Sequence, residues 1–324
     1  MKISTRAEIL EILRMPEEEF RAAVMPQAYE EYLRRDGRLI VTSMLGYSNI
    51  CRNQCLYCGM RAGNSGLTRY RIEPDDVIGA VRMAHDAGFS RVFLISGEDP
   101  KYGFDNLLRI VRELHGLGMF ISLAAGELPE GGYDELAQAG VNEYVLKFEM
   151  SQREVFNRLN PSTDFDRRMA DIAAVQRSGM LLASGNIIGY PGHTAEMCAD
   201  DILLMKQLGI SWAPVIPYLP AAGTPLAQEG GRGDLLMMLK EVAVLRLMMP
   251  EVRITAQQPG KDLKKGLADA EGNLDAVRAG ANVLFCDLLP QAQARSFRVI
   301  DDRNVTGTEH IRRVAEVSGM TLSF

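Results

Sequence analysis

Three cysteines within eight residues are the part of this sequence best suited to chemistry. Cys51, Cys55 and Cys58 lie in the stretch CRNQCLYC. Cysteine thiolates bind zinc and iron–sulfur clusters. A closed zinc site needs four ligands, but no second cysteine pair is present and the four histidines are scattered. Three thiolates can instead hold three corners of a [4Fe–4S] cube and leave its fourth iron open, whereas three buried structural cysteines are the plainer alternative.

The other two cysteines, Cys198 and Cys286, stand alone. An odd number of thiols with one tight cluster does not form a disulfide framework, so both are expected to be buried small hydrophobes. The N-terminus leads into an acidic stretch, and no apolar run approaches the ~18 residues of a membrane span. The net charge of -6 argues against nucleic acid as a partner. These features predict a cytoplasmic protein that binds neither nucleic acid nor a membrane.

Polar residues also follow several short apolar runs. Ser96, Gly97 and Glu98 come after the run 91–95, and Gln257 and Gln258 come after the run 252–256. Such residues can cap the next element. Charged residues at these positions more commonly form surface ion pairs. They can also line a site at the ends of strands, and the fold decides between these alternatives.

The elements that must position these residues alternate regularly. After a helical segment at 1–37, apolar strand-like runs alternate with amphipathic helical runs through 38–324, often with glycine between a helix and the next strand. The expected strands are 38–45, 91–95, 119–124, 143–147, 181–188, 212–216, 252–256 and 282–285. The expected helices are 73–87, 106–115, 133–139, 167–178, 195–208, 235–248, 274–279 and 309–317.

Eight such units predict a (β/α)8 TIM-type barrel with short N-terminal helices, and a doubly wound open sheet is the second choice. In a barrel the active site lies at the carboxyl ends of the strands. The cysteine stretch follows the first strand, so the barrel places it at this edge. The predicted organisation is a helical segment at 1–37 followed by the barrel at 38–324, which includes a C-terminal helix.

The spacing Cys-x3-Cys-x2-Cys, with the aromatic residue Tyr57 before the last cysteine, resembles the radical S-adenosylmethionine (SAM) superfamily. The resemblance spans about 38–317. It implies that Cys51, Cys55 and Cys58 hold a [4Fe–4S] cluster whose open iron binds the amino and carboxylate groups of SAM. An injected electron then cleaves SAM to methionine and a 5′-deoxyadenosyl radical, which attacks the substrate.

The same resemblance implies the SAM contacts. The turn at 96–98 is similar to the family's Gly-Gly-Glu motif, which meets the SAM ammonium group. A glutamate at the end of the fourth strand meets the ribose, and an arginine of the next helix meets the carboxylate; spacing favours Arg168 over Arg167. The stretch 185–192 is similar to the family's Gly-x-Ile-x-Gly, whose backbone meets the adenine. The implied SAM-binding residues are Tyr57, Ser96, Gly97, Glu98, Glu149, Arg168 and Ile188.

Within the superfamily, the stretches 56–60, 96–100 and 188–192 resemble the biotin-synthase-like branch, and most of all the HydE type of FeFe-hydrogenase maturase. A methylornithine-synthase-like mutase is the alternative. The chain departs from both at Met150, where they tend to carry threonine, and from HydE at Lys147, where that type carries arginine. Lysine and arginine differ in how they clamp a carboxylate, so these differences concern the substrate.

The resemblance further implies a small, amino-acid-like substrate and an electron donor of the flavodoxin or ferredoxin type. A non-enzymatic iron–sulfur protein, either an electron carrier or a redox sensor, is the alternative of another class. It accounts for the cysteines but not for the polar strand ends.

Overall fold

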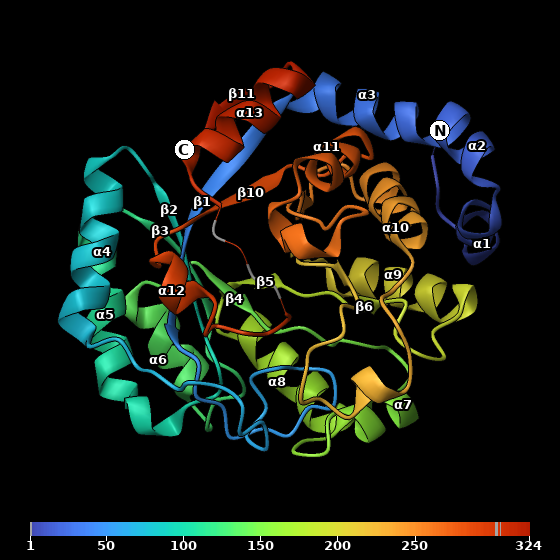
Figure 1. Cartoon of the computed structure of the whole chain (residues 1–324). Helices are drawn as coiled ribbons and strands as arrows, with labels where there is room; N and C mark the ends of the chain where they lie inside the picture. The colour runs from blue at the N-terminus through green and yellow to red at the C-terminus, as the bar shows by residue number, and fades with distance from the viewer. Residues whose placement is uncertain (1, 302–303, 305) are drawn as a thin grey trace.

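Parallel strands alternate with helices through most of the chain in the computed structural model, which describes residues 2–301, 304 and 306–324 (Figure 1). The strands are β1 (Arg38–Ser48), β2 (Arg91–Ser96), β3 (Phe120–Ala124), β4 (Glu143–Val145), β5 (Leu181–Ala183), β6 (Ile187–Ile188), β7 (Trp212–Ala213), β8 (Ile216–Pro217), β9 (Arg253–Ile254), β10 (Val283–Asp287) and β11 (Thr321–Ser323).

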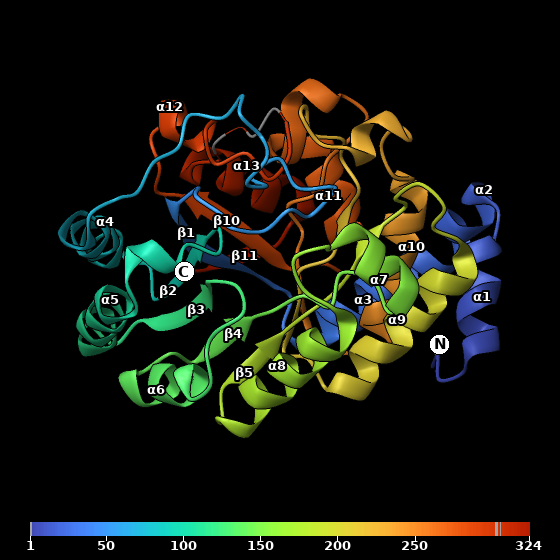
Figure 2. The same ribbon diagram turned by 90° about the horizontal axis from the view of Figure 1, so that it is seen from below.

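Helices cover the outside of the sheet, as the view from below shows (Figure 2). They are α1 (Arg6–Arg14), α2 (Glu17–Glu19), the π-helical turn η1 (Phe20–Val24), α3 (Met25–Arg35), α4 (Pro74–Asp86), η2 (Pro100–Tyr102), α5 (Phe104–Gly116), α6 (Gly132–Ala139), α7 (Arg153–Leu159), α8 (Phe165–Arg177), α9 (Ala195–Leu208), η3 (Leu226–Gln228), α10 (Leu235–Met248), η4 (Leu263–Ala268), α11 (Ala270–Arg278), α12 (Gln291–Ala294) and α13 (Thr308–Ser318). No helix of the described part of the chain is both long enough and apolar enough to cross a membrane.

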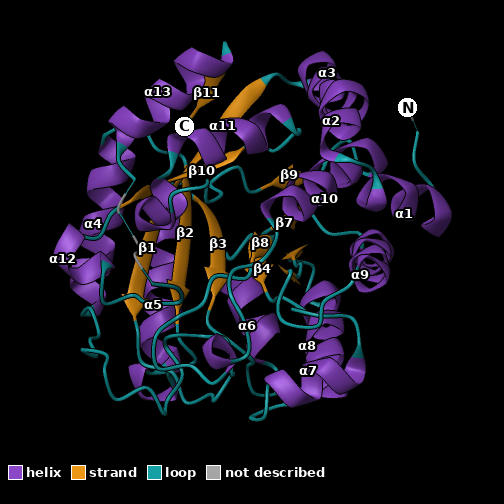
Figure 3. Ribbon diagram, turned by 45° about the vertical axis from the view of Figure 1, so that its right-hand side comes forward, coloured by secondary structure: helices purple, strands orange, loops and turns teal. Residues whose placement is uncertain are grey.

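The strands form a nearly closed barrel, which confirms the predicted fold class. Their order is β10-β1-β2-β3-β4-β5-β7-β9, and neighbours along it pair in parallel. Just beyond β9, Thr255 forms a parallel bridge with Val283 of β10, and the Ala256 N–H donates to the Val283 carbonyl at 2.8 Å. These contacts bring the two ends of the sheet together. In Figure 3 the arrowheads of β1, β2 and β3 point to the edge where long loops gather.

Two predicted strands are wrong as single elements. The run 181–188 divides into β5 and β6, and the run 212–216 divides into β7 and β8. Strands β6 and β8 pair with each other as a separate small sheet. At the first break the Ser184 hydroxyl accepts the Phe148 N–H at 3.2 Å, so a side chain takes the place of a ladder partner. At the second break Pro214 lacks an N–H to donate. Side-chain chemistry therefore interrupts the pairing that the apolar pattern predicts.

Several short elements were not predicted. Helix α7 lies between β4 and α8, and strand β11 pairs with the start of β1 through Arg38–Thr321 and Ile40–Ser323. The helix predicted at 274–279 begins earlier, at Ala270, where the Asp269 side chain caps it by accepting from the Glu271 N–H. A seven-residue helix and a three-residue strand carry too little periodicity to stand out in a sequence.

An aromatic layer fills the barrel interior. The rings of Phe93, Trp212 and Phe285 lie 5.2 to 5.9 Å apart and pack with Val145 and Ala183. Lys147 and Glu149 follow the end of β4 towards the carboxyl edge, where they pair with each other at 3.0 Å. The barrel is therefore closed by apolar groups beneath this edge, and the reactive residues lie above them.

The N-terminal helices pack on one side of the barrel. Helix α1 contacts α9 and α10, and α3 contacts α10, whose residues from Met238 to Met248 are all buried. The predicted division between a helical segment at 1–37 and the barrel at 38–324 stays a prediction.

Candidate active site

The cysteine loop follows β1 and is held by side chains on both sides. The Asn49 amide is buried, donates to the carbonyls of Thr68 and Ser296, and accepts the Tyr70 N–H at 2.7 Å. The Arg69 guanidinium donates to four carbonyls of the loop, those of Asn49, Met60, Arg61 and Asn64. One cation thus fixes the path of the backbone that presents the three thiols.

Gly97 brings the end of β2 against the loop. A Cβ atom at this position would lie 2.8 Å from the Cβ of Cys51 and closer still to the Ile50 carbonyl. The Gly97 N–H also donates to the Ser48 carbonyl at 3.0 Å. Glycine therefore permits a close approach of two backbones, as it does in many ligand sites.

Gly97→Ala is expected to displace the cysteine loop, because the atoms in the way are largely backbone. Overpacking of this kind costs about 1–3 kcal/mol of stability, and we expect less iron bound per chain after anaerobic reconstitution. Iron content and thermal melting measure the two effects. Gly79→Ala in α4, where an added Cβ meets nothing within 4 Å, is the matched control. Wild-type iron content in Gly97→Ala would contradict the expected displacement.

The three thiols share one half-buried environment. Burial raises the pKa of Cys51, Cys55 and Cys58, that of Cys55 to about 12, and neighbouring cysteine charges add to the shifts of Cys55 and Cys58. Among the described residues, no three His, Cys, Asp or Glu side chains converge on a single metal ion. A tetrahedral zinc site needs its donors about 2.3 Å from one point, whereas a cube binds each thiolate at a different iron. The arrangement favours a cluster over zinc.

Arg168 lies at the same edge, close enough to Cys55 and Tyr57 for their charges to interact. Its side chain is buried; Nε donates to Glu127 at 2.9 Å and Nη1 donates to the Lys147 carbonyl. No described residue accepts a hydrogen bond from its Nη2 atom. The neighbouring Arg167 points away and pairs with Asp171. The structure thus brings Arg168, as predicted, beside the cysteine loop, and part of its fork is available.

Glu149 has an unusual backbone conformation. Its φ of 61° is the only positive φ outside glycine in the described chain. Its carboxylate atom Oε2 is buried and lies 3.0 Å from Lys147 Nζ, but it accepts no well-oriented hydrogen bond from a described residue. Strain of this kind costs about 1–3 kcal/mol and is concentrated at functional sites. A hydroxyl donor would satisfy the orphaned oxygen, which is consistent with the predicted ribose contact.

Tyr57 packs against a separate apolar cluster beside the loop, and the adjacent Ile188 belongs to the main core. The Tyr57 hydroxyl donates to Asn160 at 2.7 Å, and the Ile188 carbonyl accepts the Tyr218 N–H at 2.7 Å. The buried hydroxyls of Tyr190 and Tyr218 have no hydrogen-bond partner among the described residues. The other members of this cluster are Met150, Phe156, Leu159, Ile187 and Leu226. The site therefore combines an apolar wall with unpaired hydroxyls.

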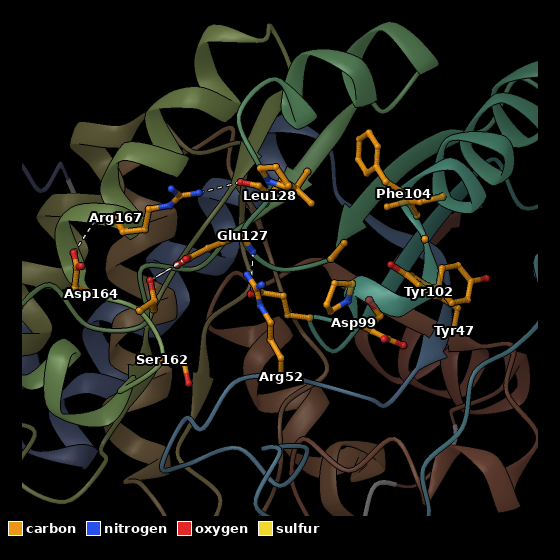
Figure 4. Close-up of a pocket in the computed structure, with 18 residues that line it drawn as sticks. Tyr47, Arg52, Asp99, Tyr102, Phe104, Glu127, Leu128, Ser162, Asp164 and Arg167 are labelled. Carbon is orange, nitrogen blue, oxygen red and sulfur yellow. Dashed lines mark hydrogen bonds and ion pairs between the residues drawn. The ribbon is translucent and has the colours of Figure 1, made fainter.

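Glu98 lies against the loop, but other groups already hold its carboxylate. Arg52 Nε donates to it at 2.6 Å, Asn53 Nδ2 at 2.8 Å and the Glu127 N–H at 3.1 Å. Glu98 and Ser96 line a cavity of about 560 Å³ that extends outwards, past Arg52 and Glu127, to Tyr102 (Figure 4). An ammonium group that approached Glu98 would therefore share the carboxylate with Arg52.

Sequence reasoning missed Glu127, which links the two sides of the site. Its carboxylate binds Arg168 and Thr163, and its backbone N–H binds Glu98. Glu127 lies three residues beyond the end of β3 and directly after Gly126, so an acidic residue after a glycine at a strand end is the sequence feature that marks its position. The amides Gln257 and Gln258, in contrast, bond to protein groups distant in sequence, Thr306 and the Val215 carbonyl, and their predicted alternatives of capping or substrate binding stay open.

Comparison with known proteins decides the family. Residues 45–205 match the Radical SAM superfamily. The chain is 30% identical to the [FeFe] hydrogenase maturase subunit HydE of Thermotoga maritima, over 91% of this chain and 83% of that protein. The chain belongs to the radical SAM superfamily.

Other radical SAM relatives agree with the predicted branch. The 3-methylornithine synthase of Methanosarcina barkeri is 28% identical over 87% of this chain and 80% of its own length, and a biotin synthase of Beijerinckia indica is 29% identical over 72% and 73%. The crystal structure of methylornithine synthase (PylB) superposes with a TM-score of 0.86 at 24% identity, over 99% of this chain and 94% of that one, which shows a shared fold. Radical SAM enzymes use a [4Fe–4S] cluster and SAM.

The residues present fit both radical SAM cofactors. Three thiols on one loop, with no single-ion site among the described residues, suit the cluster. The orphaned Glu149 oxygen and the free edge of the Arg168 guanidinium suit the hydroxyls and carboxylate of SAM. Roles for individual residues stay predictions.

A buried polar network lies behind Glu149. Cys198 and Cys286 are both buried within the core, as predicted, and Cys198 also donates its S–H to Glu241 at 3.0 Å. Asn186 donates to Glu241 at 3.3 Å and to Asp201 at 3.0 Å. Burial raises the pKa of Glu241 to about 8, and the Asp201 charge adds to the shift, while the bonds from Cys198 and Asn186 and the charge of Lys147 oppose it.

Glu241→Gln is expected to remove a pH dependence of stability. Between the ordinary pKa of 4.5 and about 8 the folded state holds the proton that the unfolded chain loses. The free energy of unfolding therefore falls as pH rises through this window, by up to about 1.4 kcal/mol per pH unit. In denaturant unfolding, the free energy of unfolding of Glu241→Gln relative to wild type should be higher at about pH 8 than at about pH 5. The exposed Glu30→Gln is the control, for which this difference should be the same at both pH values. A difference that is constant with pH would contradict this assignment.

Proposed function

We propose that this protein is a radical SAM enzyme of the HydE type. In this proposal Cys51, Cys55 and Cys58 hold the [4Fe–4S] cluster. The proposed SAM-binding residues are Tyr57, Ser96, Gly97, Glu98, Glu149, Arg168 and Ile188. The observation that carries the proposal is that the cysteine loop, the buried Glu127–Arg168 pair and the strained Glu149 meet at one edge of a parallel barrel. When bound, the cluster and SAM supply the electron transfer and the radical chemistry.

The protein groups bind and orient. Arg168 offers its Nη2 edge to a carboxylate, for which a guanidinium is well shaped. Glu149 accepts from a ribose hydroxyl, and Tyr57 with the Ile188 backbone packs beside the adenine. The aromatic layer of Phe93, Trp212 and Phe285 closes the barrel below the site, which keeps water away from a reactive species.

The substrate is proposed to be small and amino-acid-like, as part of FeFe-hydrogenase cofactor maturation. The support is the 30% identity to HydE over most of both chains, together with the Lys147–Glu149 pair, which offers one charge of each sign to a zwitterion. We further propose a flavodoxin- or ferredoxin-type electron donor and a cytoplasmic location, where thiols stay reduced.

The test has two stages. Anaerobically reconstituted protein is given SAM and a strong reductant, and 5′-deoxyadenosine is measured. If none forms, the alternative of a non-enzymatic electron carrier or redox sensor is favoured. The gene is then expressed in a hydrogenase-producing strain that lacks HydE. Restored hydrogenase activity supports the HydE type, and a SAM-cleaving protein that fails to restore activity in this strain argues against it.

A methylornithine-synthase-like mutase is the second candidate, supported by the 28% identity over 87% of the chain. Lysine is an isomer of 3-methylornithine, so a product with the mass of lysine but a different retention time, formed from lysine, SAM and reductant, decides. Formation of 3-methylornithine, without hydrogenase rescue, would replace the HydE proposal.

A further inference from the structure

We infer that Asp201, a buried residue of α9, is a positioning residue that holds together the two strand-end segments carrying Glu149 and Ile188 and thereby sets the affinity for SAM. The inference rests on the proposed function, because it assigns Asp201 a role through residues proposed to contact SAM. Asp201 contacts neither the cysteine loop nor the cavity of Figure 4 in the described structure.

Both oxygens of the Asp201 carboxylate are bonded to strand-end segments. Oδ1 accepts the Ser151 N–H at 2.8 Å, and Oδ2 accepts from Asn186 Nδ2 at 3.0 Å. His193 Nε2 lies 3.4 Å from the same Oδ2 atom, a close contact that lacks the geometry of a hydrogen bond. The carboxylate is fully buried, and a buried carboxylate is costly unless donors surround it. The donors that surround Asp201 thus come from segments at the carboxyl edge of the barrel.

Each donor lies next to a proposed SAM contact. Ser151 is two residues after Glu149, and Asn186 forms a parallel bridge with Glu149 just before β6. The His193 atom Nδ1 accepts the N–H of Gly189, the residue after Ile188, at 2.8 Å. One carboxylate therefore ties down the chain after Glu149, its bridge partner and the loop after Ile188.

These bonds help to hold Glu149 in its strained backbone conformation. A glutamate with φ of 61° keeps this conformation only where its surroundings determine it. The Glu149 N–H donates to the Gly185 carbonyl and the Glu149 carbonyl accepts from the Ile187 N–H, so the strain is shared with the segment that Asn186 anchors. Helix α9, whose N-terminus is capped by Thr194, provides the rigid support. Loss of the anchor is expected to let Glu149 relax away from the ribose.

Asp201→Asn tests the inference with little change of shape. The carbonyl of the substituted side chain can still accept from Ser151, but its NH2 group then faces two donors. These are Asn186 Nδ2 and the Nε2–H that His193 must carry, since its Nδ1 is an acceptor. By analogy with residues that orient the direct ligands of a site, we expect the SAM dissociation constant to rise about 10- to 100-fold. KM for SAM rises with it, while iron per chain stays at the wild-type value because Arg69 and Asn49 hold the cysteine loop separately.

The matched control is Asp200→Asn, which changes the neighbouring residue of the same helix. Asp200 pairs with Arg6 at the surface, so its variant is expected to bind SAM and iron as wild type does. Equilibrium binding of SAM to the reconstituted proteins, with iron analysis of the same samples, measures both quantities. Should Asp201→Asn fail to fold, Asn186→Ala, which removes the link between Asp201 and the start of β6 together with the longer bond to Glu241, decides by the same criteria.

Three outcomes separate the hypotheses. Weakened SAM binding with full iron in Asp201→Asn supports the inference. SAM affinity within twofold of wild type, or a parallel loss of iron and SAM that tracks a lower melting temperature, overturns it and leaves Asp201 a structural residue. Failure of the wild-type protein itself to bind SAM would instead overturn the proposed function.

Discussion

Cys55→Ala is expected to abolish cluster binding and SAM cleavage while the barrel stays folded. Three thiolates bind three irons of a cube and leave the fourth open. Loss of one thiolate leaves only two ligands, so we expect the cluster to be lost and not merely bound more weakly. Arg69 and Asn49 fix the loop through hydrogen bonds in which the Cys55 thiol takes no part. The loop should therefore keep its path.

Iron and sulfide per chain, 5′-deoxyadenosine formation and circular dichroism measure the three parts of this expectation. Cys286→Ala is the control, because it removes a buried thiol from β10 that lies within the core. We expect it to keep its iron and its activity. Full activity in Cys55→Ala would remove the central assignment, and unfolding of Cys55→Ala would show that the thiol supports the fold.

The barrel could be predicted because its signals are local and repeated. A strand such as β2 or a helix such as α5 contains an apolar pattern of its own, and eight such pairs in sequence restrict the topology. The break within the fifth barrel strand could not be predicted in this way. It depends on Ser184 and Asn186 finding partners just after β4 and on α9 and α10, which are distant in sequence.

The residues of the candidate site could likewise be predicted where a short motif carries them, but not where distant contacts define them. The cysteines, Glu98, Glu149 and Arg168 were found because short motifs carry them. Glu127 and Asp201 were not, because their importance arises from contacts 41 and 50 residues away, with Arg168 and Ser151. A single sequence gives no sign of such pairs. The sequence also does not show that Arg52 donates a hydrogen bond to the Glu98 carboxylate, which changes how an ammonium group could approach that carboxylate.

The buried ion pairs at the site restrict which substitutions can test SAM recognition. Removing one partner leaves an unpaired charge in a desolvated place, which costs about 3–5 kcal/mol and obscures any effect on SAM. A change that keeps the charge but alters its shape isolates recognition from stability. Arg168 permits such a change, since lysine retains the cation beside Glu127.

Arg168→Lys is therefore expected to fold and to bind iron but to lose SAM affinity. An ammonium group can pair with Glu127, but it cannot at once reach the Lys147 carbonyl and present a second, parallel N–H edge to a carboxylate. Loss of a charged hydrogen bond of this kind costs about 1.5–3 kcal/mol, which is about 10- to 100-fold in the SAM dissociation constant. Equilibrium SAM binding to the reconstituted protein measures it, with iron per chain as the internal reference.

Arg167→Lys is the matched control, because it makes the same change one residue earlier, where the guanidinium is half exposed and pairs with Asp171. A surface pair of this type contributes about 0–1 kcal/mol, so this variant should bind SAM as wild type does. The opposite pattern, with weak SAM binding in Arg167→Lys and normal binding in Arg168→Lys, would move the carboxylate contact to Arg167. SAM would then lie towards the cavity of Figure 4, which Arg167 lines together with Glu98, and not beside Glu149. The two variants thus locate the SAM carboxylate on one side of Glu127 or the other.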